Sequence, residues 1–100
     1  MYAIRQTLEF QKWLKRLPDR PIRARIVRRI ERLASGNAGD QRFLGAGLYE
    51  LREHAGPGYR LYFTLMTGRL ILLLVGGDKG SQKSDIARAR AMISSLETYT

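Results

Sequence analysis

Residues 48–75 read LYELREHAGPGYRLYFTLMTGRLILLLV and contain three strand-like runs separated by two turns. The turn signals are Gly-Pro-Gly at residues 56–58 and Thr-Gly at residues 67–68. Apolar and polar residues alternate in the first two runs, which predicts strands with one buried face. The third run, residues 70–75, is apolar on both faces, as in a central strand, and the Gly-Gly pair at residues 76–77 is expected to end it. Short turns between consecutive strands predict an antiparallel meander.

Two helix-like segments precede the meander. Thr7 can cap the first segment, and Pro18 ends it. Asp19 can cap the second segment, and Gly36 suits the position just after its end. Apolar residues recur at helical spacing in both segments: Phe10, Trp13, Leu14 and Leu17, then Ile22, Ile26, Ile30 and Leu33. Arginines fill most other positions of the second segment, so the pair predicts a helical hairpin whose basic outer surface faces solvent.

The remaining segments complete an α+β architecture. Residues 2–5 predict a short first strand and residues 42–44 a further one, and a closing helix is predicted from about Ser81 or Ser84 to Glu97. The order is therefore β-α-α-β(3–4)-α, and runs of helices followed by runs of strands are typical of α+β folds. We expect a single compact domain over residues 1–100, with an antiparallel meander sheet that carries the helical hairpin on one face. The other face is expected to stay at least partly open to water.

The net charge favours a polyanionic partner. The chain has 18 Lys and Arg against 9 Asp and Glu, a formal net charge of +9. Residues 1–40 hold ten basic and four acidic groups, so most of the excess lies in the helical segments. Nucleic acid is the first candidate partner, ahead of an acidic protein or an anionic membrane face. The alternative is a solvated basic surface that keeps a small protein soluble.

The composition excludes several kinds of site. Cysteine is absent, which excludes disulfides, thiolate zinc sites and cysteine nucleophiles. Because there is also a single histidine, no metal and no other cofactor is expected. The longest apolar run is far too short to span a bilayer, and the N-terminus MYAIRQTLEF lacks the apolar region of a signal peptide. We therefore expect a soluble cytoplasmic protein with no membrane partner.

Strand parity groups polar and aromatic side chains on one sheet face. If Tyr49 and Leu51 face the helices, the alternate residues of the first two strands face the open side. The candidate set on that face and at its rim is Glu50, Arg52, His54, Arg60, Tyr62, Lys79, Gln82 and Lys83. Such a surface offers arginine forks for phosphate oxygens and a ring on which a base can stack. The alternative is an ordinary solvated face, in which Arg52 pairs with Glu50 and His54 has no chemical role.

These segments carry a resemblance to a known family. They are Leu-Tyr-Glu-Leu-Arg at residues 48–52, Gly-Pro-Gly-Tyr-Arg-Leu-Tyr at residues 56–62, and Gly-Gly-Asp-Lys at residues 76–79, followed by Gln82 and Asp85. In this order and spacing they resemble the bacterial RelE/ParE toxin superfamily, and more closely its branch of addiction module killer proteins, which is related to HigB toxins. The similarity covers nearly the whole chain. It implies a compact α+β toxin of a type II toxin–antitoxin pair.

The resemblance implies one of two activities. RelE-like members cut messenger RNA in the ribosomal A site, whereas ParE-like members inhibit DNA gyrase. A non-catalytic basic module that binds nucleic acid is the third possibility. The resemblance also implies a cognate antitoxin, in this branch usually a small helix-turn-helix protein. RelE has a tyrosine at the start of its last helix, but residues 82–86 here contain none and Tyr99 lies much further on, so the general base is left open.

For a nuclease, the resemblance and the residue types together suggest a metal-independent mechanism with roles for each group. The 2′-hydroxyl would attack the scissile phosphate, giving a 2′,3′-cyclic phosphate. Arg60, and after it Arg52, would stabilise the phosphorane charge. Lys79 would hold the phosphate or protonate the leaving oxygen, and His54 would act as general base or acid, with Glu50 as the competing base. Substrate-binding contacts are expected from Glu50, Tyr62, Gln82 and Lys83.

Overall fold

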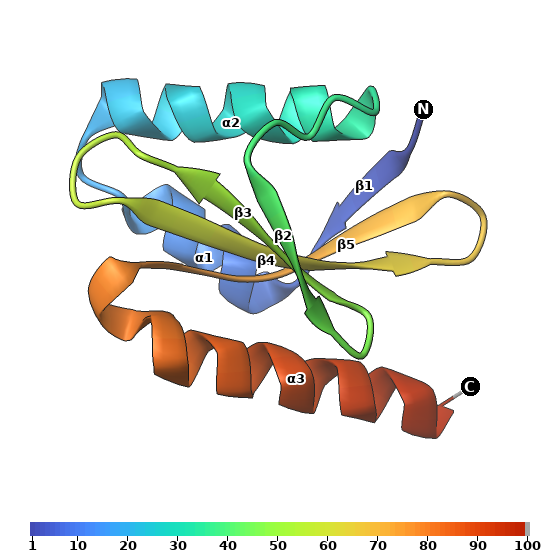
Figure 1. The fold of residues 1–100 in the computed structure, drawn as a ribbon. Coiled ribbons are helices and arrows are strands. Elements are labelled where there is room, and N and C mark those ends of the chain that lie inside the picture. Colours follow the sequence, from blue (N-terminus) through green and yellow to red (C-terminus); the bar gives the residue numbers. More distant parts are fainter. Residues whose placement is uncertain (100) are drawn as a thin grey trace.

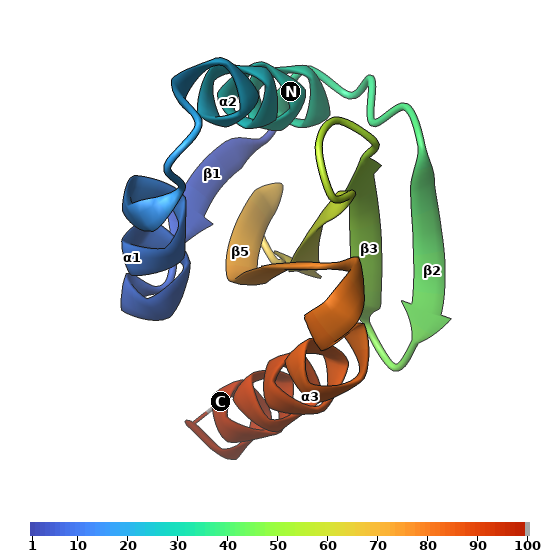
Figure 2. The same cartoon turned by 90° about the vertical axis from the view of Figure 1, so that its left-hand side faces the viewer.

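The sheet is the central layer of the molecule, with helices on both sides (Figures 1 and 2). The structure is a computed structural model that describes the backbone of residues 1–99 and the side chains of residues 1–96. Its elements, in chain order, are β1 (Ala3–Gln6), α1 (Leu8–Arg16), α2 (Arg20–Ala34), β2 (Gln41–Gly45), β3 (Leu48–Glu53), β4 (Tyr59–Met66), β5 (Leu70–Asp78), the short 3₁₀ helix η1 (Lys79–Ser81) and α3 (Gln82–Tyr99).

The sheet combines an antiparallel meander with one parallel strand. Its strand order over the described residues is β1-β5-β4-β3-β2. Strands β2 to β5 pair antiparallel in succession, which confirms the predicted α+β fold and its meander. Strand β1 instead runs parallel to β5, with Ala3 beside Leu70 and Gln6 beside Leu73. The chain therefore crosses from one edge of the sheet to the other through α1 and α2 before the meander begins (Figure 1).

The first two helices begin and end as the sequence predicts. The Thr7 hydroxyl accepts a hydrogen bond from the Phe10 amide at 3.0 Å, and the Asp19 carboxylate accepts one from the Ile22 amide at 3.2 Å. Gly36 has a φ of +93°, the left-handed conformation that glycine adopts readily after a helix. None of the described helices is both long and apolar enough to cross a membrane.

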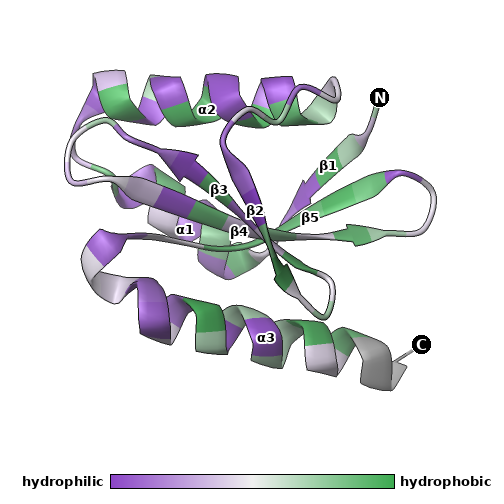
Figure 3. Cartoon of the chain, in the orientation of Figure 1, coloured by the Kyte–Doolittle hydropathy of each residue, from purple (hydrophilic) through white to green (hydrophobic). Residues whose placement is uncertain are grey.

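Each face of the sheet has its own apolar core. On one face, α1 and α2 bury Phe10 and Ile26 against Leu51 and other strand residues. On the opposite face, α3 packs against a second cluster, which consists of Leu48, Tyr62, Leu74, Val75 and Ala89. Strand β5 contributes to both cores and is hydrophobic along most of its length (Figure 3). The face expected to be open is thus partly covered, because the closing helix folds back across it (Figure 2).

Strand β5 continues through the glycine pair that was expected to end it. The indole of Trp13 packs on Gly76, where an added Cβ would lie 2.2 Å from Cε3 of the ring. On the other side of the strand, a Cβ on Gly77 would lie 1.8 Å from a carboxylate oxygen of Asp85 in α3. The expectation of a break is wrong because these glycines serve close packing rather than a turn. The strand reaches Asp78, which places Lys79 at its end.

The substitution Gly76→Ala should destabilise the protein. The new methyl group would overlap the Trp13 ring, and overpacking of this kind costs about 1–3 kcal/mol. Urea unfolding of the variant and the wild type measures the difference in unfolding free energy.

The same substitution in a Trp13→Leu background is the control, because the smaller side chain removes the overlap. An equal loss of stability in both backgrounds would show that the Trp13 contact is not the cause.

Candidate functional site

A pocket lies between the end of β3, the turn that follows it, the start of β4 and the first residue of η1. Its volume is ≈ 350 Å³, and its lining includes the cations Arg52, Arg60 and Lys79, together with His54, Tyr59 and one carboxylate, Glu53. The strand register explains this grouping, because Arg52 lies directly opposite Arg60, and Arg60 lies opposite Gly77 near the end of β5. The pocket therefore brings together the four residues that the sequence analysis selected for chemistry.

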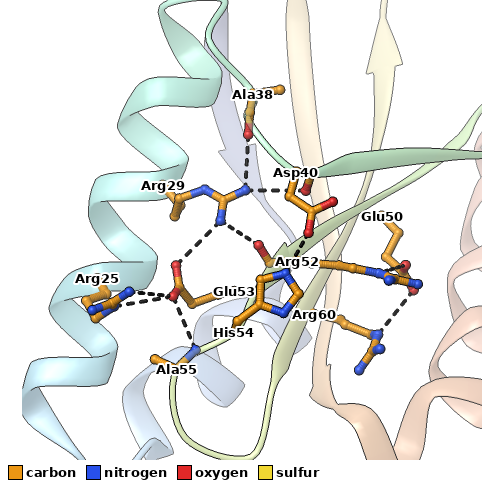
Figure 4. A network of polar contacts seen from close by, with 10 residues as sticks. All are labelled: Arg25, Arg29, Ala38, Asp40, Glu50, Arg52, Glu53, His54, Ala55 and Arg60. Atoms are coloured by element: carbon orange, nitrogen blue, oxygen red, sulfur yellow. Dashed lines mark hydrogen bonds and ion pairs between the residues drawn. The ribbon is translucent and has the colours of Figure 1, made fainter.

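Glu50 lies behind this pocket as a fully buried carboxylate. Its Oε1 accepts a hydrogen bond from Nε of Arg52 at 2.9 Å, and its Oε2 accepts one from Nε2 of Gln82 at 2.9 Å. The Nε of Arg60 lies 3.6 Å from the same Oε2 (Figure 4). The expectation that Glu50 sits on an open face is wrong, because α3 begins directly over it and Gln82 turns inward to reach it.

The surroundings of Glu50 keep it ionised. Burial by itself raises the pKa of a carboxyl group, since a low-dielectric site disfavours the charge. Here the hydrogen bonds from Arg52 and Gln82 outweigh burial, so the pKa of Glu50 lies below its ordinary value. A buried carboxylate with a lowered pKa is poorly suited to act as a general base near neutral pH.

Tyr62 is also buried, and the prediction that its ring lies on an open face is wrong. Its ring belongs to the core under α3, next to Ala89 and Val75. Its hydroxyl has no hydrogen-bond partner among the described residues. Burial, and after it the negative charge of Glu50, raises the pKa of Tyr62 far above the usual tyrosine range. In this conformation the ring cannot stack on a base, and the phenol stays protonated.

His54 stands at the exposed rim of the pocket and is paired with Asp40. The distance from its Nε2 to Oδ2 of Asp40 is 2.6 Å, and 74% of the His54 side chain is exposed. This hydrogen bond is the main cause that holds the pKa of Asp40 below its ordinary value. Over the described residues, the two do not form part of any group of three or more His, Cys, Asp or Glu that could hold a metal ion.

The other rim residues differ in what they contact. Lys79 is exposed and borders the pocket, as predicted. Gln82 is directed to Glu50 rather than to the pocket. Lys83 is exposed on the first turn of α3 but is not among the residues that line the pocket.

The expectation that the arginines of this helix simply face solvent is wrong for Arg25 and Arg29 of α2. They pair with Glu53, the buried glutamate on the opposite face of β3, at 3.1 and 3.5 Å. Arg29 also donates to the backbone carbonyl of Arg52 and, at 3.1 Å, to that of Ala38 (Figure 4). Helix α2 thus anchors the backbone of the strand that supplies Arg52.

Two residues of this region, Asp40 and Tyr59, were not predicted from the sequence. Asp40 ends a glycine-rich loop, and no local pattern relates it to a histidine 14 positions away. Tyr59 borders the pocket, although its ring packs edge-on against Trp13 at 6.1 Å. Tyr59 packs against the core on the α1 and α2 side, and its position at the start of β4 also exposes it to the pocket.

The chain is similar in sequence to a protein family and to an individual bacterial protein. A model of a protein family described as "Phage derived protein Gp49-like (DUF891)" matches residues 12–93. An uncharacterized protein of Haemophilus influenzae is 42% identical over 93 residues, which cover 93% of this chain and 94% of that protein.

Solved structures with the same fold come from E. coli. A chain of the intact RelBE toxin–antitoxin complex is 17% identical with a TM-score of 0.64, over 78% of this chain and 96% of that chain. The isolated RelE toxin is 16% identical with a TM-score of 0.63, over 78% of this chain and 84% of that chain. At these identities the likeness establishes the fold.

Replacing Glu50 by glutamine should change how stability depends on pH. Because the folded-state pKa of Glu50 lies below its ordinary value of 4.5, its stabilising effect is complete above that pH and is lost as the pH falls through the folded-state value. Relative to Glu50→Gln, the wild type should lose up to about 1.4 kcal/mol of unfolding free energy per pH unit in this acid range.

Denaturant unfolding of the two proteins between about pH 3 and pH 6 measures this difference. If the unfolding free energies of the two proteins change with pH in parallel, the carboxylate of Glu50 has the same pKa in the folded and unfolded chains.

Proposed function

Since the chain belongs to the phage-derived Gp49-like family and has the fold of RelE, we propose that it is the toxin of a type II toxin–antitoxin pair and cleaves messenger RNA on the ribosome. The observation that carries the proposal is the pocket in which Arg52, His54, Arg60 and Lys79 converge. A cationic pocket with one titratable imidazole at its rim suits a phosphodiester better than a neutral substrate.

The reaction class is an internal transesterification. The 2′-hydroxyl beside the scissile phosphate loses its proton and attacks phosphorus, and the bond to the 5′-oxygen of the next nucleotide breaks. The products are a 2′,3′-cyclic phosphate on one fragment and a 5′-hydroxyl on the other. Catalysis then rests on positioning the phosphate and on stabilising the charge of the phosphorane.

Arg60 and Arg52 supply that stabilisation. Their side chains are mostly withdrawn from water, with 11% and 24% of their surfaces exposed, and charge interactions are stronger in such a site. Lys79 is more exposed and can bind a non-bridging oxygen or protonate the 5′-oxygen that leaves.

His54 is the candidate for proton transfer. Its Nε2 contacts Asp40, while its Nδ1 makes no hydrogen bond to a described residue. The carboxylate of Asp40 can orient the ring and stabilise its protonated form, as an orienting acid does beside other catalytic histidines. The Nδ1 is then available to accept the proton of the 2′-hydroxyl. Tyr62, being buried, does not take the place of the tyrosine that RelE has at its last helix.

The partner that this function requires is a cognate antitoxin. The formal charge of +9 favours an acidic segment, which would cover the pocket and pair its carboxylates with the exposed cations. A small helix-turn-helix protein is the kind of antitoxin that the sequence resemblance implies.

Mapping of RNA 5′ ends after brief induction of the chain without its antitoxin tests the proposal. We expect new 5′-hydroxyl ends inside translated reading frames, and we expect Arg60→Ala to reduce cleavage about 10²–10³-fold, because it removes a charge that stabilises the transition state. Arg28→Ala is the matched control, since Arg28 is an exposed arginine of α2 that does not line the pocket, and it should cleave like the wild type.

Other outcomes would redirect the proposal. Growth arrest with intact messages, together with inhibited supercoiling, would favour a gyrase inhibitor. Salt-sensitive binding to nucleic acid without arrest or cleavage would favour a non-catalytic module. A folded Arg60→Ala protein with wild-type cleavage would remove Arg60 from the site.

A further inference from the structure

Glu50 stands behind the pocket and contacts residues of three elements at once. Its carboxylate binds Arg52 on its own strand, lies 3.6 Å from Arg60 on β4, and accepts a hydrogen bond from Gln82, the first residue of α3. The two arginines line the pocket, whereas Glu50 is fully buried and does not. We propose that Glu50 is a positioning residue, which holds the guanidinium groups of Arg52 and Arg60 by their Nε edges so that their Nη groups serve the phosphate.

The approach through Nε is the geometric basis of this role. Arg52 donates a hydrogen bond to the carboxylate from Nε, whereas the buried Nε of Arg60 lies 3.6 Å from it, in an ion pair that is too long for a hydrogen bond. The Nη atoms of both arginines make no hydrogen bond to a described residue. Each Nη pair therefore keeps its fork of donors for another anion, and such a fork matches two phosphate oxygens. Figure 4 shows both guanidinium groups converging on the Glu50 carboxylate.

The strand register creates the need for a counter-ion. Arg52 and Arg60 are cross-strand neighbours, and like charges in this arrangement repel one another. The carboxylate lies on the side of the two arginines that faces away from the pocket. It reduces their repulsion there, and the side that faces the pocket stays positive. Without the carboxylate, the two side chains would move apart into solvent and lose their common orientation.

The contact with Gln82 extends this role to the third element. Oε2 of Glu50 binds Gln82 at 2.9 Å, so the carboxylate also fixes the start of α3. The short helix η1 with Lys79 directly precedes this residue. One buried group thus sets the relative positions of the three segments that supply Arg52, Arg60 and Lys79.

The positioning of Arg52 and Arg60 explains the buried charge of Glu50 better than a contribution to stability does. Burying an ionised carboxylate carries a large desolvation cost, and apolar side chains of similar size often stabilise a protein as well or better. The chain nevertheless places a charged group here, beneath α3 and among the aromatic and aliphatic residues of the second core. The effect on RNA cleavage rests on the proposed function, whereas the orientation of the arginines does not.

Arginine side-chain NMR and single-turnover cleavage of ribosome-bound message test this proposal on the full-length chain. In Glu50→Gln, the Nε–H signals of Arg52 and Arg60 should move to the positions of solvent-exposed arginines, and the cleavage rate at saturating substrate should fall about 10²-fold. The substrate concentration for half-maximal rate should change much less, because the arginines keep their charge.

Glu9→Gln is the matched control. It also neutralises a glutamate that pairs with an arginine, but Glu9 of α1 pairs with Arg88 of α3 at 2.7 Å, and neither residue lines the pocket. In this variant the Nε–H signals of Arg52 and Arg60 and the cleavage rate should stay near those of the wild type.

The outcomes separate this proposal from the proposed function. Unchanged Arg52 and Arg60 signals in folded Glu50→Gln would overturn the positioning role. Displaced signals in a chain whose wild type cleaves no RNA would support positioning and reject the nuclease. If Glu50→Gln does not fold, Glu50→Asp keeps the charge but withdraws the carboxylate by one methylene group, and an undiminished cleavage rate in that variant would contradict the proposal.

Discussion

The contact of two helices with the backbone of β5 from opposite sides organises the whole molecule. Trp13 of α1 lies against Gly76, and Asp85 of α3 lies against Gly77. Because neither glycine has a side chain, both helices approach the middle layer closely, and each encloses an apolar core of its own. The same approach brings the first turn of α3 over Glu50, so the packing that forms the second core also forms the floor of the pocket.

Because side chains alternate along β3, its two buried glutamates lie on opposite faces of the sheet. Glu50 on one face and Glu53 on the other are both buried, and each neutralises arginines on its own side. On the α2 side the arginines are thereby used to hold the helix against the sheet. The pocket at the end of the sheet is lined by Arg52, Arg60 and Lys79 and by one carboxylate, Glu53, so it remains positive.

Local signals in the sequence were sufficient for much of the fold, because caps, turns and strand alternation depend on neighbouring residues. Thr7 and Asp19 cap their helices as expected, and the parity of β3 and β4 correctly groups Arg52 with Arg60. Contacts between distant segments are not indicated by any local pattern in the sequence. The place of β1, the cover of α3 over Glu50 and the pairing of Asp40 with His54 all depend on tertiary packing, which propensity and periodicity do not encode.

The parallel strand at the sheet edge has a consequence for the order in which the protein is made. Strand β1 leaves the ribosome before its pairing partner in β5, which lies some 67 residues later, and Gln82 follows later still. A contact of such wide sequence separation cannot form before its second partner has been synthesised. The nascent chain therefore carries its arginines for most of its synthesis without the frame that orients them, and the pocket takes shape only when the last helix has emerged.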